Sequence, residues 1–464
     1  MIFQAIDDKN ECIGIYANGK LDFENIPTGL TRTWKYSGSV TDEAIEYGWL
    51  YAGGKKLIDC CPDELVDELQ SAQKKARAYI KSFEIAKINL RDHCIYDLIP
   101  YDFLMEFCEV KNKVTEHVFN NFNKPNNYEH LNAVQKLLHK IKYQNLNIDI
   151  SDCKHLLISS VVRSKIQRIS KNNFIDYDLF GTVTGRLTTK QNSFPVLTMK
   201  KEIRQIMKPN NDLFIALDYN GAEVRTLLEL QSVEQPAEDI HEWNCKHLFE
   251  QEVTRDECKV RFFAWLYDPE SSDINTELYD RECLLNTWYD GTHIRTPYGR
   301  CIEVEKRKAF NYLIQSTTAD RVLEKAVKIN DVLQDHKSHV SHIIHDEVVL
   351  DYSDKDRDLI PLVKEVFEDG AIRIDYNGDF LNENRLEFSD VFGFSWGPLA
   401  SIKIGNVEAQ VNATHITTGE SIDLGSYTLD LSEDRFLVDL NGKIDANKVL
   451  VVHRAGANRQ VPHL

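Results

Sequence analysis

The sequence predicts an α/β (α+β) protein in which a helical region precedes a mixed region of strands and helices, with β-rich segments at both ends. Three observations predict this class. Apolar residues recur at the helical period from about residue 62. Short continuous apolar runs near residues 213 and 341 have the pattern of buried strands. Residues 1–61 and 401–464 contain short apolar pieces separated by Asn and Gly.

The helical region is predicted from its apolar spacing. A long helix is expected to begin at Pro62, because the fixed φ of proline suits the first turn and the two acids that follow suit the positive end of the helix dipole. Further helices are expected at about 101–120 and 129–142, where apolar residues again follow the helical period. We therefore expect antiparallel helices packed together within residues 62–175.

Composition and charge exclude few classes of function. No apolar run in the 464 residues is long enough to span a membrane, and the start lacks the basic and apolar segments of a secretory signal, so a cytoplasmic location is expected. The formal net charge of −18 does not favour nucleic acid, yet residues 154–175 hold five basic side chains and no acidic one. Charge therefore permits a DNA partner without indicating one.

The ten cysteines are scattered, without a CxxC pair or the Cys/His spacing of a zinc site. In a chain of this size, this distribution predicts reduced and mostly buried thiols rather than a disulfide framework.

Two aspartates follow predicted strands. The apolar run 213–217 ends in Asp218, and two strand-like runs flank His345-Asp346, which predicts a hairpin with an acid at the bend. Two acids at the ends of neighbouring strands are suited to hold two divalent ions about 4 Å apart for phosphoryl transfer, and Mg²⁺ prefers such oxygen ligands. Either acid alone is more often a turn or capping residue.

The sequence around these acids resembles that of family A DNA polymerases. Residues 218–225 read DYNGAEVR and resemble motif A, usually written DYSQIELR, while residues 345–349, HDEVV, resemble motif C. Between them, four side chains at every fourth position share one broad face of a helix and resemble motif B: Arg255, Lys259, Phe263 and Tyr267.

Further segments agree with this resemblance, which covers about residues 175–400. They are residues 182–187 (TVTGRL), 239–241 (DIH), the spacing Arg307, Asn311 and Gln315, and residues 392–397 (FGFSWG). The resemblance implies a right-hand polymerase fold with palm, fingers and helical thumb. The implied division begins with a β-rich region at 1–61 and a thumb at 62–175. A palm at 176–235 and 331–400 would carry motifs A and C. Fingers with motif B and a duplex-contacting helix would lie at 236–330, and a β-rich extension at 401–464.

The resemblance also implies a role for each site residue. Asp218, Asp346 and the Tyr219 carbonyl would bind two Mg²⁺ ions, for which Mn²⁺ can substitute. Lys259 would protonate the leaving pyrophosphate, and Glu347 joins the catalytic group. The nucleotide-binding residues would be Arg255, Lys259, Phe263, Tyr267, Glu223, Tyr219 and His241. The residues that contact primer–template DNA would be Arg186, Arg307, Asn311, Gln315, His345 and Arg225.

Glu223 carries the expected choice of sugar. In the family, the corresponding glutamate lies under the sugar and excludes a 2′-hydroxyl, which predicts deoxynucleotide substrates. The motifs also depart from the family pattern. Gly221 and Ala222 stand where larger residues are usual, which predicts a looser floor of the nucleotide pocket. Ala264 and Asp268 stand where glycines are usual.

The regions outside the resemblance lead to weaker expectations. Asp7, Asp8 and Glu11 are expected to form a solvated acidic turn rather than an exonuclease site. The compact form resembles bacteriophage replication polymerases, for which another chain could supply proofreading. Two interpretations of residues 401–464 remain. The segment is either a β domain that contacts DNA, a processivity factor or another replisome partner, or a structural appendage.

Two alternatives remain beside the DNA polymerase. One is a single-subunit RNA polymerase, and the presence of Glu223 and Glu347 argues against it. The other is a catalytically inactive DNA-binding accessory subunit, which would have little reason to keep two acids, the Arg/Lys pair and both aromatic residues together.

Overall fold

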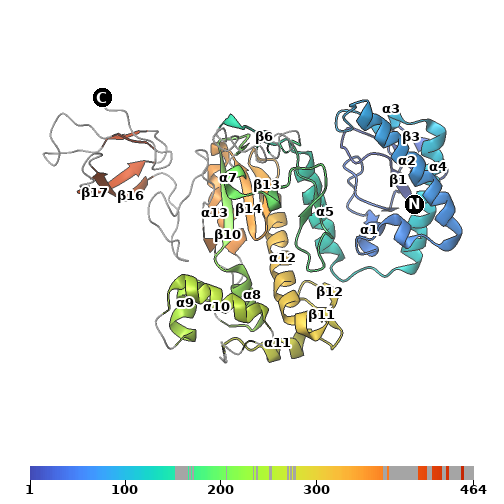
Figure 1. The fold of residues 1–464 in the computed structure, drawn as a ribbon. Coiled ribbons are helices and arrows are strands. Elements are labelled where there is room, and N and C mark those ends of the chain that lie inside the picture. Colours follow the sequence, from blue (N-terminus) through green and yellow to red (C-terminus); the bar gives the residue numbers. More distant parts are fainter. Residues whose placement is uncertain are drawn as a thin grey trace. The chain divides into compact units, whose positions relative to one another are not determined.

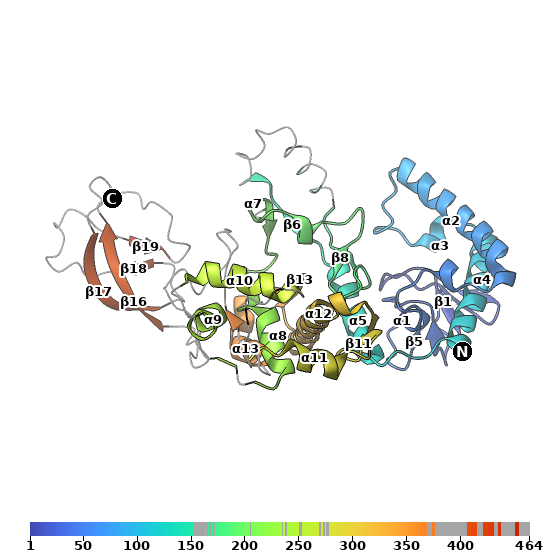
Figure 2. The ribbon, with the colours of Figure 1, turned by 60° about the horizontal axis from the view of Figure 1, so that its bottom comes forward.

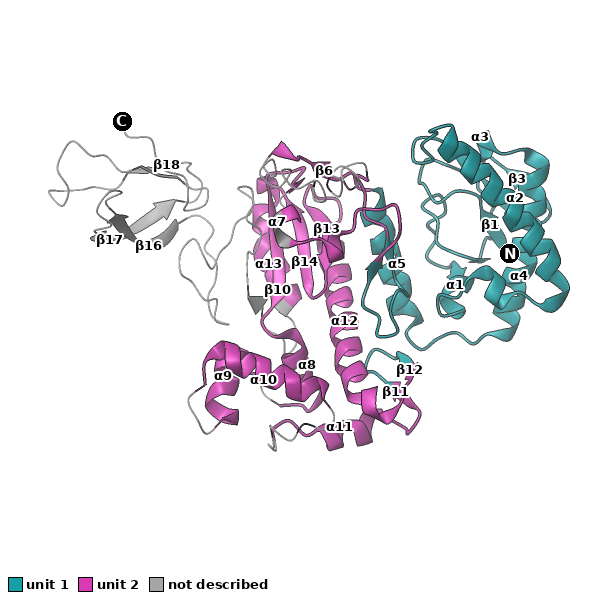
Figure 3. Cartoon of the chain, viewed as in Figure 1, with its two compact units in different colours: residues 1–143, 177–188, 295–301 teal, residues 144–176, 189–294, 302–464 magenta. Residues whose placement is uncertain are grey.

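The computed structural model describes residues 1–151, 172–204, 206–233, 239–249, 253–268 and 278–368, several single residues between these ranges, and the backbone of five strands beyond residue 373. Helices and mainly antiparallel strands both occur, which confirms the mixed prediction (Figure 1). The chain divides into two compact units, coloured separately in Figure 3. Unit 1 comprises residues 1–143, 177–188 and 295–301, and unit 2 comprises the remaining residues. No described helix combines the length and apolar character that crossing a membrane requires.

Unit 1 combines short strands with three long helices. Its strands are β1 (Phe3–Ala5), β2 (Ile15–Ala17) and β3 (Lys20–Asp22), which form an antiparallel sheet, and β4 (Arg32–Thr33) and β5 (Glu46–Tyr47), which pair in parallel. Its helices are α1 (Gly48–Tyr51), η1 (Leu57–Cys60), η2 (Asp63–Leu65), α2 (Val66–Ile85), α3 (Ile95–Leu98), α4 (Tyr101–Asn121) and α5 (Tyr128–Tyr143). Helices α4 and α5 confirm the two shorter predicted helices to within one residue, and a 3-10 turn precedes the predicted long helix, α2.

One hydrophobic core joins the two parts of unit 1 that the sequence analysis divided at residue 61. Trp34 and Leu57 from the strand-rich part pack with Leu69 of α2 and with Val110 and Val114 of α4. Residues 1–61 are therefore part of the same packed body as these helices. The thumb, palm and fingers ranges stay predictions.

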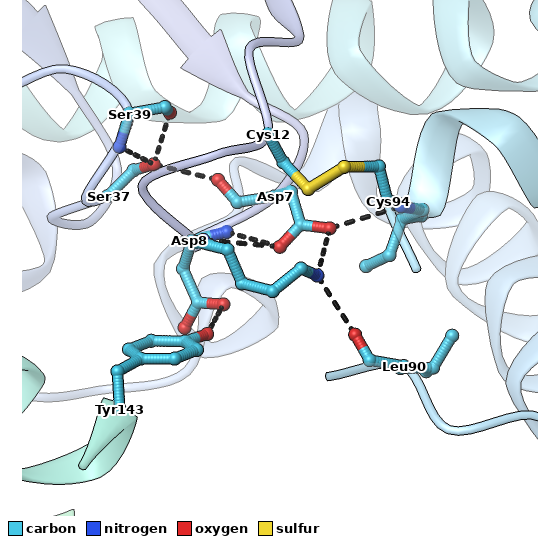
Figure 4. The surroundings of a disulfide bond; sticks show 10 residues. Asp7, Asp8, Cys12, Ser37, Ser39, Leu90, Cys94 and Tyr143 are labelled. Carbon is cyan, nitrogen blue, oxygen red and sulfur yellow. Dashed lines mark hydrogen bonds and ion pairs between the residues drawn. A yellow bond between two sulfur atoms is a disulfide. The ribbon is translucent and has the colours of Figure 1, made fainter. Parts of the chain in front are cut away.

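A disulfide closes the start of unit 1, contrary to the prediction of reduced thiols. Cys12 is bonded to Cys94, across 82 positions in sequence (Figure 4). Sequence spacing gave no signal for this bond, because the two residues meet only after the chain has folded around α2. Seven further cysteines among the described residues are free thiols, and three of these are buried: Cys60, Cys108 and Cys258.

The acids beside this disulfide do not form a solvated turn. Asp7 is buried; its carboxylate accepts hydrogen bonds from the Lys9 ammonium at 2.6 Å and from the Ile95 backbone N–H at 3.0 Å (Figure 4). Asp8 accepts hydrogen bonds from Lys142 and Tyr143. Burial alone would raise the pKa of Asp8, but these partners lower it to about 2. Asp7 is therefore bound inside the protein, and Asp8, whose side chain is 45% exposed, is held in an ion pair, which corrects the prediction for these two acids. Glu11 is exposed, as predicted.

Unit 2 is organised around a four-stranded antiparallel sheet with the order β13-β14-β10-β15. These strands are β10 (Leu213–Tyr219), β13 (His339–Ile344), β14 (Glu347–Tyr352) and β15 (Ile374–Asp375). The helices are η4 (Val196–Thr198), α7 (Lys201–Arg204), α8 (Ala222–Leu230), α9 (Ile240–Leu248), α10 (Arg255–Tyr267), α11 (Arg281–Trp288), α12 (Lys306–Val332), η5 (Asp354–Leu359) and α13 (Ile360–Glu368). Helix α12 lies against β13 and β14 (Figure 1), and α9 and α10 lie side by side in both views (Figure 2).

A second hydrophobic core lies among the helices of unit 2. Val224 and Leu227 of α8 pack with Phe262 of α10 and with Phe310 and Leu313 of α12. Because all three helices contribute to this core, α10 has a buried face that fixes which of its side chains point away from the protein interior.

The remaining strands are short or near the C-terminus. The small pairs are β6 (Asn147–Ile148) with β9 (Met207–Lys208), β7 (Tyr177–Asp178) with β8 (Thr188–Thr189), and β11 (His293–Arg295) with β12 (Cys301–Glu303). Beyond residue 400, β16 (Asn406–Thr414) pairs with β17 (Ser421–Asp430), and β18 (Arg435–Leu437) pairs with β19 (Val451–His453). The predicted segment 392–397 and most of the basic stretch 154–175 lie outside the described residues.

Candidate active site

The two predicted metal-binding aspartates lie at the same end of the central sheet. In the antiparallel pair of β10 and β14, Leu217 faces Val348, so Asp218 follows at the end where β14 begins. Strands β13 and β14 are joined by the two-residue turn His345-Asp346, and His345 has a left-handed φ of 56°. The strand that ends in one acid and the hairpin with the other at its bend are both confirmed. Adjacent strands lie about 5 Å apart, which suits a pair of shared ions.

The turn after Asp218 is tight. Gly221 has a φ of 63° and precedes the first residue of α8. A Cβ atom at this position would lie 2.5 Å from the Ile240 Cγ2 atom, so glycine permits α9 to approach the end of β10. The prediction of a looser pocket floor is therefore wrong at Gly221, because Ile240 fills the adjacent space.

Tyr219 turns its side chain into the protein. Its ring stacks on Phe367 of α13 with centroids 4.2 Å apart, and its hydroxyl donates a hydrogen bond to the Phe367 carbonyl at 3.1 Å. These contacts anchor the end of β10 against α13. They leave only the backbone of Tyr219 for the metal contact that the resemblance implies.

Arg225 is wrong as a direct DNA contact. Its side chain is 1% exposed, and the guanidinium donates to the Asn220 carbonyl at 2.7 Å and to the Pro236 carbonyl at 3.3 Å. A buried arginine that satisfies backbone carbonyls stabilises the local fold instead. The resemblance to motif A includes the arginine, but it did not indicate that the side chain of Arg225 is buried.

Helix α10 presents the predicted four-residue face beside its buried face, and Phe263 packs against the edge of the core. Cys258, Phe262, Trp265 and Leu266 are buried, whereas Arg255, Lys259 and Tyr267 are exposed and Phe263 is half-buried. The rings of Phe263 and Tyr267 stack with centroids 5.8 Å apart. Thr254 and Glu257 form a capping box that fixes where this helix begins.

Two residues predicted to bind the nucleotide are in direct contact. The Tyr267 hydroxyl donates a hydrogen bond to the Glu223 carboxylate, which is 7% exposed at the start of α8. This bond joins the beginning of motif A's helix to the end of α10. Neither motif alone predicted the contact.

His241 is buried and neutral near the cations of α10. Burial is the main reason that its pKa falls to about 4, and Lys259, Arg255 and Arg225 lower it further, although Asp239 opposes them. Its ring lies 5.9 Å from that of Phe263, and within the described part of the chain its Nδ1 atom has no hydrogen-bond partner.

Asp239 and Asn220 lie in segments that the resemblance covers, but sequence reasoning gave neither of them a role. Asp239 caps α9 by accepting hydrogen bonds from the backbone N–H groups of His241 and Glu242, and it forms an ion pair with Arg255. The Asn220 side chain donates to Asp239 at 2.6 Å. A strong N-cap residue before α9 was the only available sequence signal.

The predicted DNA-binding residues lie on different parts of the structure. Arg307, Asn311 and Gln315 follow one face of α12, with Arg307 exposed in its first turn. Helix α12 is held to α8 by a hydrogen bond of 2.9 Å from Thr318 to Thr226. Arg186 belongs to unit 1, apart from these residues in the division of the chain.

The carboxylates at the sheet end fit Mg²⁺. Asp218 and Asp346 are half-buried carboxylates, and Mg²⁺ needs one or two carboxylates because it keeps several waters and binds substrate phosphates. Among the described residues, no group of three or more His, Cys, Asp or Glu side chains could hold a metal. A site on the present residues would therefore depend on these two acids, with Glu347 next to Asp346 in sequence.

Comparisons with known proteins give little beyond these residues. No family model and no curated protein matches the sequence. Among solved structures, the chain is similar to the POL domain of Pol1 from M. smegmatis in complex with DNA primer-template and dNTP. The TM-score is 0.46 and the identity 14%, over 59% of this chain and 74% of that chain. At this identity and score the likeness adds no evidence about activity.

Proposed function

We propose that this protein is a template-directed DNA polymerase that adds deoxynucleotides to a primer 3′ end. The observation that carries the proposal is the joining of two motifs at one site. Asp218 is the last residue but one of β10, at the sheet end that also holds the Asp346 turn, and the helix that follows β10 carries Glu223, to which Tyr267 of α10 is hydrogen-bonded. The arrangement combines candidate metal ligands with a face able to bind a nucleotide.

The acids would hold the ions of the reaction. Asp218, Asp346 and the Tyr219 carbonyl are the proposed ligands of two Mg²⁺ ions, which supply activation of the 3′-hydroxyl and neutralisation of the triphosphate charge. Lys259 is exposed on α10 and is the proposed proton donor to pyrophosphate as it leaves.

The outward face of α10 would bind the nucleotide. Arg255 and Lys259 supply two cations for the triphosphate, one helical turn apart, and Phe263 and Tyr267 supply stacked rings for the bases. Buried and neutral, His241 would donate or accept a hydrogen bond without adding charge.

Selection of deoxynucleotides would depend on Glu223. Its carboxylate is buried, and Tyr267 satisfies one of its oxygens, so a 2′-hydroxyl would have to be accommodated beside an already bonded, desolvated acid. We propose that this favours a deoxyribose substrate over a ribose one.

The surroundings of this centre would hold the primer–template. Arg307, Asn311 and Gln315 on α12 and His345 in the hairpin turn are the proposed DNA contacts of this centre. Arg186, which belongs to unit 1, is proposed separately as a DNA contact. We further propose a role in bacteriophage DNA replication, on the motif resemblance alone. Asp7 and Asp8 are engaged in internal contacts, so we assign them no exonuclease function.

Primer extension tests the proposal. Purified protein with a primed template, Mg²⁺ and deoxynucleotides should extend the primer, and Asp346→Asn should abolish extension while retaining DNA binding, because the acid acts in the transition state. A preference for ribonucleotides would favour the RNA polymerase alternative. DNA binding without extension by the wild type would favour the accessory subunit and contradict the proposal.

A further inference from the structure

We propose that Asp239, held by Asn220, is a positioning residue that presents the guanidinium of Arg255 to the triphosphate of the incoming nucleotide. This inference rests on the proposed function, since it deepens the nucleotide-binding part of the same site. Neither Asp239 nor Asn220 would touch the substrate. Their effect would be transmitted through the orientation of Arg255.

The ion pair fixes the orientation of Arg255 and leaves donors available. Its Nε atom donates to Asp239 Oδ1 at 3.2 Å, and its Nη2 atom donates to Oδ2 at 2.8 Å. This side-on fork uses about two of the five N–H donors of a guanidinium, and the others point away from Asp239. Asp256, the neighbouring acid in sequence, is 92% exposed and lies 3.8 Å from Arg255, so solvent weakens its attraction to the guanidinium.

Asp239 is itself held in place from the other side. Its Oδ1 atom accepts hydrogen bonds of 2.9 Å from two backbone N–H groups of α9, those of His241 and Glu242. Its Oδ2 atom accepts one of 2.6 Å from the Asn220 amide. Although burial opposes the charged form, these donors and Arg255 hold the pKa of Asp239 well below its usual range. A carboxylate with five donors is saturated, and it serves as an anchor rather than as a ligand for the nucleotide or a metal.

Asn220 connects this anchor to the strand that carries Asp218. The residue is 8% exposed and lies two positions after that aspartate. Its Oδ1 atom accepts a hydrogen bond of 2.9 Å from the Ile240 backbone N–H, while its Nδ2 atom donates to Asp239. The cation on α10 is therefore fixed, through two side chains, relative to the acid on β10. Productive geometry at an active site tolerates errors of only about 0.5 Å, which gives this connection a function.

Steady-state kinetics on single variants tests the positioning role. Asparagine is also a good N-cap, so Asp239→Asn keeps an acceptor for α9 while it removes the charge and one acceptor of the Arg255 fork. We expect the KM for deoxynucleotide to rise about tenfold with kcat within about twofold, as for lost ground-state binding. Arg255→Lys, which leaves Asp239 and the cap untouched, should raise KM similarly because lysine cannot make the fork.

A matched control and a double variant complete the test. Asp256→Asn removes a neighbouring, exposed acid and should leave KM unchanged. In an Arg255→Ala background, adding Asp239→Asn should cause no further rise in KM, because the two residues act through one contact. Additive effects on KM would show that Asp239 acts independently of Arg255, and they would overturn the inference.

The outcomes separate this inference from the proposed function. If the wild type does not extend a primer, the polymerase proposal fails. If the wild type extends the primer but Asp239→Asn and Arg255→Lys have the same KM as Asp256→Asn, the polymerase proposal stands and the positioning role is wrong. Thermal unfolding of each variant should lie close to that of the wild type, so that a KM effect does not come from misfolding.

Discussion

Two pairs of aspartates in this chain differ in their surroundings in the fold. In unit 1, the Asp7 carboxylate is buried against Lys9 and Asp8 is bonded to Lys142. In unit 2, Asp218 and Asp346 are half-buried, the first near the end of β10 and the second in the turn between β13 and β14. Asp7 and Asp8 precede a polar stretch, whereas Asp218 follows an apolar run and Asp346 lies between two of them. The difference teaches that the identity of its neighbours in space determines whether a carboxylate stabilises the fold or is suited to bind an ion.

The strongest way to break this comparison is to remove one acid from each site. Asp218→Asn should lower the rate of primer extension at least about a thousandfold, or about 4 kcal/mol of transition-state stabilisation, with unfolding almost unchanged. Asp7→Asn should leave the rate per folded molecule unchanged but lower the free energy of unfolding by about 3 to 5 kcal/mol, because the Lys9 ammonium stays buried without its partner. Extension assays and urea denaturation measure the two effects.

A crossed result would contradict this interpretation. If Asp7→Asn abolished extension without a change in stability, the acids of unit 1 would have a catalytic role. Lys9→Met combined with Asp7→Asn provides the control, since removing both charges should restore part of the stability lost by the single variant.

The disulfide of unit 1 gives the next largest expected effect. Because Cys12 and Cys94 close a loop with a sequence separation of 82, the bond restricts the unfolded chain, and Cys12→Ser should lower the free energy of unfolding by about 4 kcal/mol. Denaturation with and without reductant measures it. Cys283→Ser removes an exposed free thiol and should have no effect. Equal stability of Cys12→Ser and the wild type would show that the bond does not contribute.

The smallest expected effect concerns His241 and pH. Its pKa falls from 6.5 in an unfolded chain to about 4 in the fold, so acid protonates the unfolded state first. The contribution of His241 to the free energy of unfolding is complete above about pH 6.5. It decreases by up to about 3 kcal/mol as the pH falls to about 4. His241→Gln should flatten the unfolding free energy over this range. Asp239 does not interfere, because a carboxyl with a lowered pKa loses its contribution only below the ordinary pKa of 3.8. If the unfolding free energy has the same dependence on pH in the wild type and in His241→Gln, this role for His241 is ruled out.

Local patterns were sufficient to predict much of the fold. The periods of apolar residues located α4 and α5 to within one residue, and the runs before Asp218 and around Asp346 located β10 and the β13–β14 hairpin. The four-residue face of α10 also follows from sequence spacing, since a helix fixes which side chains share a side. These features depend on residues near one another in the chain.

Features that depend on distant residues were not predictable. The Cys12–Cys94 bond, the burial of Arg225 and the contact of Tyr267 with Glu223 each join segments that the chain brings together only when folded. Gly221 is a further example. Its missing side chain predicted open space in the nucleotide pocket, whereas Ile240, distant in sequence, occupies the space beside it. A single sequence shows which residues can interact, but not which partner each finds.

The two-residue turn between β13 and β14 has a consequence for how this gene can change. Successive residues of a strand point to opposite faces, and Ile344 is paired directly with Glu347 across the turn. One codon inserted into or deleted from either strand would shift the pairing register by one position and exchange the side chains that pack on the two faces of that strand, both of which are buried. A substitution at Asp346 would change the chemistry, whereas at His345 the left-handed φ of 56° also restricts which residues fit. The segment is therefore far less tolerant of insertions than an ordinary surface loop.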